Sequence, residues 1–363
     1  MVVSKMKGLA VVPGKPKSLH VRDDIPDPKR ADGDALVRVV ETGICGTDFE
    51  INEGLYGTAP PGFDYLVLGH ESLGLVEEVP SGIGLAKGDL VVSTVRRPCP
   101  EGCPPCASEQ NDMCRTGHFT ERGIVGRHGF MAERFAEDPR FLIRIPPRLK
   151  SMAVLLEPLS VVEKGIEHAF RIQQRLPWQP KVAVVLGAGT IGILAAACLR
   201  LRGLDVWVVG REPGGTPRET FLAELDLRYV SISETALEVL STRTGQADLV
   251  FEATGAAAVV MPSIGLLAPD GIAVLASVTG GERKFEVDVA TWNRQIVLGN
   301  QVVMGTVNAG RRHFEAGVRD METLEARRAG WLPRLITRRV RFTDLAAVLS
   351  RDPNGIKTVL DFS

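Results

Sequence analysis

The residues Val182-Ala-Val-Val-Leu-Gly187-Ala-Gly189-Thr-Ile-Gly192 give the clearest indication of architecture in this chain. An apolar run at 182–186, typical of a buried strand, leads into the pattern G-x-G-x-x-G, and residues 190–201 have the composition of a helix. In this context the pattern predicts a dinucleotide-binding Rossmann unit. Gly187 makes the tight turn, Gly189 admits the pyrophosphate, and Gly192 lets helix and strand pack closely. The pyrophosphate lies at the start of the helix. The cofactor-binding residues expected here are Gly187, Gly189, Thr190, Ile191 and Gly192.

Strand and helix patterns alternate after this motif. Strands are expected at 205–209, 248–251 and 272–276, a helix at 219–225, and a last strand at 357–361. Strands separated by helices imply a parallel sheet with right-handed crossovers. The first third of the chain is instead rich in short strand patterns, at 35–41, 74–79 and 89–95. The fold class is therefore α/β, with a doubly wound parallel sheet and a separate β-rich domain.

The end of the second predicted strand bears on cofactor choice. It reads Val208-Val209-Gly210-Arg211-Glu212. An acid near this position contacts the ribose of NAD, whereas an arginine accommodates the 2′-phosphate of NADP. Arg211 therefore favours NADP or dual use, while Glu212 could contact a ribose instead. Arg211 could also be an ordinary surface arginine.

Composition excludes several classes of protein. The 363 residues include 43 Lys plus Arg and 44 Asp plus Glu, a net charge of −1, which argues against a nucleic-acid partner. The longest apolar run, 182–199, is interrupted by glycines, so no membrane span is expected. The apolar stretch near the amino terminus is broken by Pro13, Gly14 and Pro16, so no signal peptide is expected. Six cysteines are too few for a disulfide scaffold in a chain of this length. These features favour a cytoplasmic protein.

Four of the cysteines have the spacing of a metal site. They are Cys99-x3-Cys103-x2-Cys106-x7-Cys114, with proline, glycine and polar residues between them. Four thiolates without an open position describe a structural zinc site. Cys198, on the predicted Rossmann helix, is expected to lie in the core.

A second set of metal-ligating residues is dispersed. Cys45 lies in Gly43-Ile-Cys45-Gly-Thr47-Asp48, and His70 and Glu71 follow Gly69. A cysteine, a histidine and a carboxylate can hold zinc with one position open for substrate. Taken singly, Cys45 and His70 are more often core residues. Asp48 either orients a metal ligand or stabilises the turn.

With these motifs the chain resembles the zinc-dependent medium-chain dehydrogenases, and within them the glucose dehydrogenase branch known from archaea. The resemblance covers nearly the whole length. Its residues include Cys45 to Asp48, Gly69 to Glu71, the four-cysteine segment, Glu121 to Ile124, Gly129 to Met131, Glu157 to Leu159, Glu163-Lys164 and Val307-Asn308.

The resemblance implies a GroES-like, β-rich catalytic domain at 1–178 and 311–363, with a Rossmann domain at 179–310 inserted before its last segment. The resemblance also implies an active site in the cleft between these two domains. It implies a catalytic zinc near Cys45, His70 and Glu71, with Glu157 as a ligand or exchange ligand. Thr47 is expected to hydrogen-bond the reacting hydroxyl. Thr254 and Asn308 are expected to join Arg211 as cofactor contacts.

The resemblance also implies a sugar substrate. Residues matching Glu121, Glu157 and Asn308 bind sugar hydroxyls in this branch. At two further positions where this branch has a polar residue, the chain has Val95 and Leu298 instead. These two replacements favour a less polar substrate. Glu121 could alternatively be a loop carboxylate paired with Arg122 or Arg127.

The expected activity is hydride transfer from an aldose hydroxyl to NAD(P). The alternatives are a polyol or secondary-alcohol dehydrogenase and, in another class, a non-catalytic NADPH-binding protein. The expected partners are a small sugar or polyol and further copies of the chain, as a dimer or tetramer.

Overall fold

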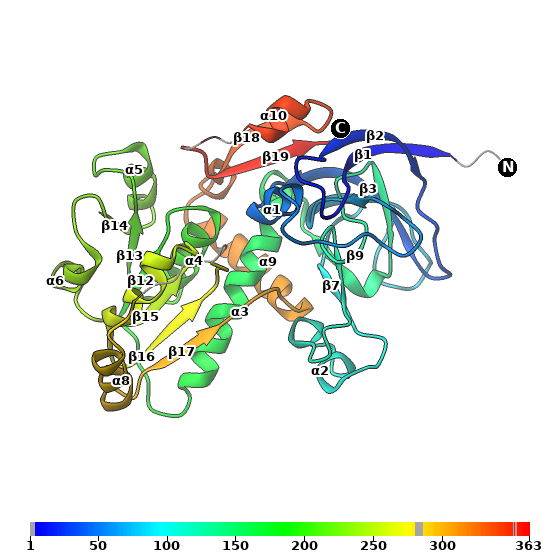
Figure 1. Ribbon diagram of the computed structural model, residues 1–363. Helices are drawn as coiled ribbons and strands as arrows, with labels where there is room; N and C mark the ends of the chain where they lie inside the picture. The colour runs from blue at the N-terminus through cyan, green and yellow to red at the C-terminus, as the bar shows by residue number, and fades with distance from the viewer. Residues whose placement is uncertain (1–3, 280–285, 351, 353) are drawn as a thin grey trace. The chain divides into compact units, whose positions relative to one another are not determined.

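The computed structural model describes residues 4–279, 286–350, 352 and 354–363. The chain divides into two compact units (Figure 1). The first unit comprises residues 1–157, 308–322 and 330–363. The second unit comprises residues 158–307 and 323–329.

The first unit is built mainly from β-strands. They are β1 Lys5–Val11, β2 His20–Pro26, β3 Ala35–Gly43, β4 Leu66–Val67, β5 Glu71–Glu78, β6 Leu90–Ser93, β7 Arg96–Arg97, β8 Thr120–Arg122, β9 Gly126–Arg127, β10 Arg134–Glu137, β11 Leu142–Ile145, β18 Ile336–Arg341 and β19 Lys357–Asp361. Its helices are α1 Gly46–Asn52, α2 Pro104–Ala107 and α10 Leu345–Leu349, with 3-10 turns at Asn111–Met113, Pro139–Phe141, Pro147–Leu155 and Leu332–Leu335.

The largest sheet of this unit joins the two ends of the chain. Its order is β11-β6-β5-β3-β19-β18, and β10 also pairs with β3. The carboxyl-terminal strand β19 runs antiparallel to β3, with Val359 opposite Gly43. This pairing agrees with the expectation that the last segment returns to the β-rich part. Two three-stranded sheets, β2-β1-β4 and β7-β8-β9, complete the unit.

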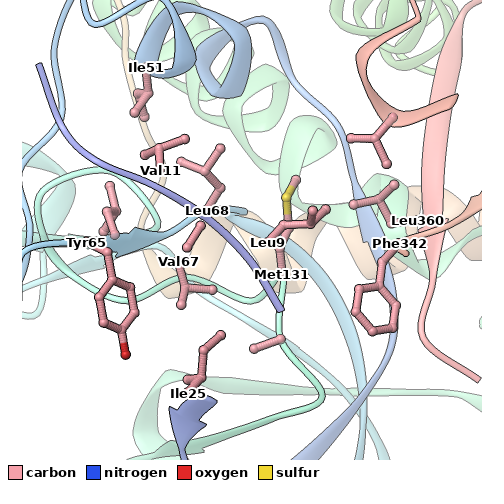
Figure 2. Close-up of a cluster of buried hydrophobic side chains, with 14 of the residues drawn as sticks. Leu9, Val11, Ile25, Ile51, Tyr65, Val67, Leu68, Met131, Phe342 and Leu360 are labelled. Atoms are coloured by element: carbon pink, nitrogen blue, oxygen red, sulfur yellow. The ribbon is translucent and has the colours of Figure 1, made fainter. Parts of the chain in front are cut away.

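The core of the first unit is formed by residues from distant parts of the sequence (Figure 2). Leu9, Leu68 and Met131 are buried together with Leu360 from β19. Burying an aliphatic side chain of this size contributes about 1.5–3 kcal/mol each. The core therefore holds the amino-terminal strands and the carboxyl-terminal strand in one unit.

The second unit contains the parallel sheet expected from the sequence. Its strands are β12 Val182–Leu186, β13 Asp205–Gly210, β14 Arg228–Ser231, β15 Ala247–Glu252, β16 Leu267–Leu275 and β17 Val302–Gly305. The order is β14-β13-β12-β15-β16-β17, and every neighbouring pair is parallel. This is the doubly wound order, with its switch point between β12 and β15. The α/β fold class is confirmed.

Helices and short 3-10 turns accompany the parallel sheet. They are α3 Leu156–Gln173, α4 Thr190–Leu201, α5 Pro217–Ala223, α6 Ser241–Thr244, α7 Ala257–Val260 and α8 Val289–Leu298, with 3-10 turns at Leu237–Val239 and Pro262–Leu266. Helix α9, Arg311–Arg327, contributes residues to both units. The predicted limits of β12, α4 and β19 coincide with those observed.

Helix α3 packs with the second unit, although the sequence places residues up to 178 in the first domain. A Cβ on Gly165 would lie 3.0 Å from the Phe251 ring and 3.1 Å from Val274. Because both residues belong to central strands of the parallel sheet, only a small residue lets α3 approach that closely. The packing units and the predicted sequence domains therefore differ in where α3 belongs.

Among the described residues, none of the helices is both long and apolar enough to cross a bilayer.

Candidate active site

The glycine-rich loop of the second unit has the geometry of a phosphate-binding turn. Gly187 has φ +112°, which strongly favours glycine. A Cβ on Gly192 would lie 1.8 Å from the Gly187 carbonyl oxygen, so the helix can approach the turn only because this residue is glycine. Gly189 precedes α4 without a side-chain cap, and a Cβ there would meet no described atom within 4 Å. Helix α4 thus begins at the glycine turn without a side-chain cap, and the start of a helix in this position favours an anion.

Thr254 follows strand β15, on the other side of the switch point. Its backbone N–H and hydroxyl both donate to the Glu252 carboxylate, which is fully buried. Its Cγ2 would lie 3.2 Å from a Cβ on Gly187, so Thr254 borders the glycine turn. The structure places Thr254 beside the predicted cofactor loop, and its role there stays a prediction.

Arg211 and Glu212 differ sharply in their surroundings. Arg211 is exposed and makes no hydrogen bond or ion pair with the described part of the chain. The Glu212 carboxylate is held by Arg218, whose Nε donates to Oε1 at 2.8 Å. The sequence did not reveal this partner, because Arg218 lies in the first turn of the next helix.

The four-cysteine segment folds into a compact cluster in the first unit. Cys103 caps α2, and its Sγ lies 3.9 Å from Cys114 Sγ. All four sulfur atoms lie within 4.8 Å of one another, and all four cysteines are free thiols. Burial raises the pKa of the Cys106 thiol to about 12. Burial also opposes ionisation of Cys114, but hydrogen bonds with Thr116 lower its pKa to about 6. This donor set fits a tetrahedral zinc ion, and the zinc site itself stays a prediction.

Cys45, His70 and Glu71 also meet in the first unit. Their ligand atoms lie within 4.8 Å of one another, and His70 and Glu71 are buried. Among the described residues, His70 Nδ1 has no hydrogen-bond partner. A buried nitrogen beside a thiol and a carboxylate is what a metal ion would satisfy. Cys198, by contrast, is buried in α4 as expected.

Asp48 connects the turns that hold Cys45 and His70. Its carboxylate accepts hydrogen bonds from the backbone N–H of Cys45 at 2.8 Å and of Gly69 at 3.3 Å. Its Oδ1 also lies 3.6 Å from His70 Nδ1. Both roles considered for Asp48 therefore have a matching contact. Its carboxylate stabilises the turn at Cys45, and it lies close to His70, a candidate metal ligand. Thr47 Oγ1 lies 3.8 Å from Cys45 Sγ.

Glu71 is placed by two residues that the sequence did not single out. The Lys357 ammonium on β19 contacts its Oε2 and donates to the Ile44 carbonyl at 2.9 Å. A Cβ on Gly43 would lie 2.0 Å from the same Oε2. A lysine at the start of a strand carries no local sign of this contact, which depends on β19 pairing with β3.

The Cys45 region carries an excess of buried acids. Burial raises the pKa of Glu157 to about 7, and the Glu71 and Asp48 carboxylates add to this shift. Burial likewise raises the pKa of Asp48. Although burial opposes protonation of His70, Asp48 and Cys45 raise its pKa well above its usual range. A divalent cation would relieve this accumulated negative potential, so the residues present fit zinc.

Glu121 and Asn308 are brought together although they are far apart in sequence. Asn308 Nδ2 donates to Glu121 Oε1 at 2.7 Å, and Arg96 Nε donates to the same oxygen at 2.9 Å. Arg122 and Arg127 pair with Glu137 instead. The alternative that pairs Glu121 with one of those two arginines is therefore wrong. Arg96 is a further residue that the sequence did not single out.

The two departures from the sugar branch lie in different surroundings. Val95 is buried next to Arg96, whereas Leu298 at the end of α8 is 76% exposed. Val95 thus belongs to the interior of the first unit. Leu298 presents an apolar side chain to solvent in the second unit.

The sequence and the fold are similar to those of known glucose dehydrogenases. Residues 150–362 match the family model "Glucose dehydrogenase C-terminus", and residues 31–147 match "Alcohol dehydrogenase GroES-like domain". Glucose 1-dehydrogenase of Methanocella arvoryzae is 42% identical over 98% of this chain and 99% of its own. Glucose 1-dehydrogenase 1 of Caldivirga maquilingensis is 42% identical over 99% of each chain.

A solved structure agrees with this relationship. Haloferax mediterranei glucose dehydrogenase, in complex with NADP, Zn and gluconolactone, matches with a TM-score of 0.90 and 36% identity over 99% of both chains. The same family assignment follows from both family models, from relatives that match over their full length, and from the fold. This chain belongs to the glucose dehydrogenase family, with a GroES-like domain of the alcohol dehydrogenase type.

Proposed function

We propose that this chain is a zinc-dependent dehydrogenase that transfers hydride from an aldose hydroxyl to NAD(P). The observation that carries the sugar assignment is the Glu121–Asn308 hydrogen bond. It presents polar groups in the unit that also contains the Cys45, His70 and Glu71 cluster. Full-length relatives that are glucose 1-dehydrogenases, and a related structure with NADP, Zn and gluconolactone, support the same proposal.

In this proposal the catalytic zinc is held by Cys45, His70 and Glu71, with Glu157 as a ligand or exchange ligand. When bound, the zinc ion acts as a Lewis acid on the substrate hydroxyl. Thr47, close to Cys45 Sγ, accepts the proton of that hydroxyl and passes it outward. Asp48 fixes the two turns that carry Cys45 and His70, and so keeps the ligands in position.

The cofactor is proposed to bind at the glycine-rich loop of the second unit. Gly189, Thr190 and Ile191 offer backbone N–H groups at the start of α4 to the pyrophosphate. Arg211 binds the 2′-phosphate, which favours NADP or dual use over strict NAD. Hydride acceptance is the chemistry that the nicotinamide supplies when bound.

The proposed substrate contacts are Thr47, Glu121, Glu157 and Asn308. Buried polar groups reject analogues that leave them unpaired. A secondary-alcohol or polyol dehydrogenase is the second candidate, and the apolar Val95, buried next to Arg96, favours it. The test is kcat/KM for glucose, galactose, xylose, sorbitol and 2-propanol with NADP and with NAD. Preference for 2-propanol over every sugar would overturn the sugar assignment.

A variant pair sharpens this test. Glu121→Ala is expected to raise KM for the preferred sugar while sparing turnover of any small alcohol that is accepted. Glu53→Ala, an exposed acid of the same unit, is the matched control and should change neither constant. Equal loss of both activities in Glu121→Ala would assign Glu121 a structural role.

Zinc content separates the enzyme from a non-catalytic NADPH-binding protein. Two zinc ions per chain are expected, one at the four cysteines and one at Cys45, His70 and Glu71. Cys103→Ser should remove the first with loss of stability, because a structural zinc contributes folding free energy. A single zinc, held by the four cysteines, together with no turnover would favour the binding protein.

Self-association is part of the proposal. Strand β17 is an edge of the parallel sheet, and Val297 and Leu298 on α8 before it are 60% and 76% exposed. Exposed sheet edges and apolar side chains are typical of association surfaces. Light scattering should show a dimer or tetramer, and a monomer at all concentrations would contradict this.

Six free thiols favour a reducing, cytoplasmic setting.

A further inference from the structure

An ion pair next to the predicted cofactor loop has no role in the function proposed so far. Arg218, on the first turn of α5, donates from Nε to Glu212 Oε1 at 2.8 Å, and its Nη2 lies 2.8 Å from the same oxygen. The Arg218 side chain is only 8% exposed, whereas that of Glu212 is 31% exposed. Arg218 is thus a buried partner for a carboxylate that reaches the surface.

The same guanidinium is attached to the glycine-rich loop. Arg218 Nη1 donates to the carbonyl oxygen of Ala188 at 2.7 Å. Ala188 lies between Gly187 and Gly189, the residues expected to approach the pyrophosphate. One side chain therefore links the loop after β12 to the segment after β13.

The segment after β13 is held from its other side as well. The Tyr229 hydroxyl on β14 donates to the Glu212 carbonyl oxygen at 2.8 Å. A Cβ on Gly210 would lie 2.3 Å from that hydroxyl. These contacts hold the backbone from Gly210 to Glu212, and the Arg218 ion pair holds the Glu212 carboxylate.

This geometry bears on which cofactor the site prefers. A free carboxylate after the second strand accepts hydrogen bonds from the ribose hydroxyls of NAD and repels a 2′-phosphate. Here the carboxylate is neutralised by Arg218, while Arg211 beside it makes no ion pair with the described residues. Arg211, Arg218 and Glu212 together therefore carry a net positive charge, and the two other carboxylates at this segment, Glu234 and Glu219, accept hydrogen bonds from the backbone N–H groups of Gly214 and Gly215.

We propose that Arg218 is a positioning residue that determines cofactor specificity, by neutralising Glu212 and fixing it to the glycine-rich loop. NADP is accepted because Glu212 is removed as a competitor for the ribose. Arg211 alone does not determine the preference. This inference rests on the proposed function, since it requires the dinucleotide to bind at this loop.

The test measures dissociation constants by isothermal titration calorimetry, with NADP⁺, NAD⁺, adenosine 2′,5′-bisphosphate and adenosine 5′-monophosphate as ligands. Arg218→Met leaves the Glu212 charge unpaired, so binding of the two 2′-phosphate ligands should weaken on the order of tenfold relative to the other two. Glu212→Gln in the Arg218→Met background should restore the original ratio. Equal weakening of all four ligands, without restoration by Glu212→Gln, would make Arg218 a structural brace and overturn the inference.

Two further variants keep the test decisive if Arg218→Met folds poorly. Glu212→Gln alone should change the NADP/NAD ratio less than about twofold, because Arg218 already neutralises the carboxylate. A larger gain in affinity for NADP relative to NAD would show that Arg218 does not neutralise Glu212, and would overturn the inference. Arg228→Met is the matched control, since Arg228 pairs with Asp205 at the amino ends of the same two strands. It should leave all four constants unchanged, and a change like that of Arg218→Met would contradict a local effect.

The proposed function and this inference fail in different ways. If the unaltered chain binds neither dinucleotide, the proposed function fails. If it binds both and the ratio does not respond to Arg218→Met, only the inference fails.

Discussion

Two clusters of buried charge in the first unit are organised in opposite ways. The Glu137 cluster, defined as Glu137 with Arg97, Arg122 and Arg127, places three cations around one acid. The Cys45 cluster, defined as Cys45, Asp48, His70, Glu71, Glu157 and Lys357, places more acids than permanent cations in a buried region. The first cluster is satisfied by the chain itself, whereas the second fits the cation that is proposed to bind there.

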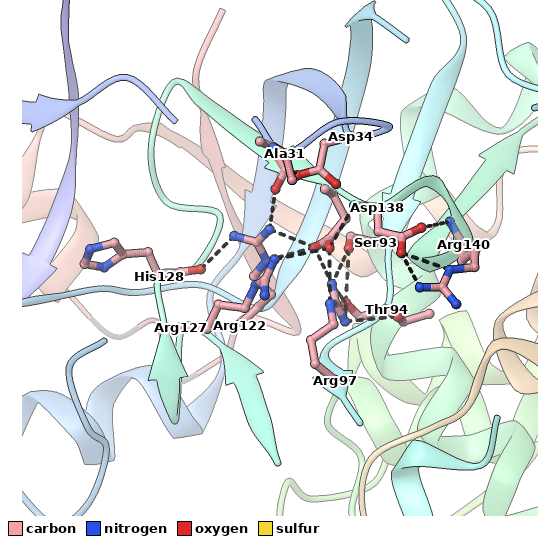
Figure 3. Close-up of polar contacts among 12 residues, drawn as sticks. Ala31, Asp34, Ser93, Thr94, Arg97, Arg122, Arg127, His128, Asp138 and Arg140 are labelled. Atoms are coloured by element: carbon pink, nitrogen blue, oxygen red, sulfur yellow. Dashed lines mark hydrogen bonds and ion pairs between the residues drawn. The ribbon is translucent and has the colours of Figure 1, made fainter. Parts of the chain in front are cut away.

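Figure 3 shows the arginines of the Glu137 cluster, Arg97, Arg122 and Arg127, with their polar contacts. Arg122 Nε donates to Glu137 at 2.9 Å and Arg97 Nε at 3.2 Å, and both arginines also donate to backbone carbonyls. Although burial opposes ionisation, the arginines lower the pKa of Glu137 to about 2. A buried acid of such low pKa is a structural element that needs no ligand.

The Cys45 cluster shows the reverse pattern. Burial and neighbouring acids raise the pKa of Glu157 to about 7, and burial raises that of Asp48. Lys357 is already committed to Glu71 and to the Ile44 carbonyl. The pKa values of the buried acids in these two clusters therefore shift in opposite directions, downward beside three arginines and upward where acids outnumber permanent cations.

The largest expected effect comes from removing a ligand of the Cys45 cluster. His70→Ala should lower kcat/KM on the order of ten-thousandfold, about 5.5 kcal/mol, because Lewis-acid stabilisation of the reacting oxygen is lost. The midpoint of thermal unfolding of the metal-free protein should change little. Steady-state kinetics and zinc content measure the first effect. Full activity in a zinc-free preparation would contradict the mechanism.

Removing the acid of the Glu137 cluster should mainly lower the stability of the protein, and not the zinc-dependent catalysis. Glu137→Gln leaves three arginines without their carboxylate and should lower the free energy of unfolding by about 3–5 kcal/mol. The readout is urea unfolding at pH 7. Glu78→Gln is the control, because Glu78 forms an exposed pair with Arg30 and should cost at most about 1 kcal/mol. Equal effects in the two variants would show that burial does not distinguish the clusters.

Acid should weaken the Glu137 cluster by a smaller amount. The folded-state pKa of about 2 lies below the usual value of 4.5, so the stabilisation is present above pH 4.5 and is lost as pH falls towards 2. Between pH 5 and pH 3 the difference in unfolding free energy between the unaltered chain and Glu137→Gln should shrink by roughly 2 kcal/mol. A difference that stays constant over this range would exclude Glu137 as the titrating group.

The smallest expected effect concerns Asp48. Asp48→Asn keeps the size of the side chain but exchanges one acceptor for a donor facing the Cys45 or Gly69 N–H. Zinc affinity at the Cys45 cluster should fall about tenfold, with the zinc of the four cysteines retained. Competition with a chelator measures both sites at once. Loss of both zinc ions together would indicate a general fold defect.

Much of the fold could be predicted because its signals are local. The turn from β12 into α4 depends on Gly187 and Gly192, whose conformations follow from adjacent residues. The four cysteines lie within sixteen residues, so a loop alone can bring them together. Strand β18, Ile-Thr-Arg-Arg-Val-Arg, gave no such signal, because four of its six residues are polar, and it is recognised only by its pairing with β19.

The sequence predicted which residues form the candidate site, but it did not predict which side chains pair with them. The sequence identified Cys45, His70 and Glu71, and Glu121 with Asn308, from their motifs. It gave no indication of Lys357 on Glu71, Arg96 on Glu121 or Arg218 on Glu212. Each of these side chains is an ordinary charged residue in its own segment.

The sequence by itself thus determined the glycine turn, the cysteine cluster, the parallel sheet and the identity of the ligand candidates. Only the tertiary structure decided which charges neutralise one another. The physical reason is the distance along the chain over which each feature is determined. Backbone conformation and short loops depend on neighbouring residues, whereas the pairing of Glu71 with Lys357 depends on β19 lying next to β3. Packing of distant segments therefore fixes whether a buried acid is a structural group or one that awaits a cation.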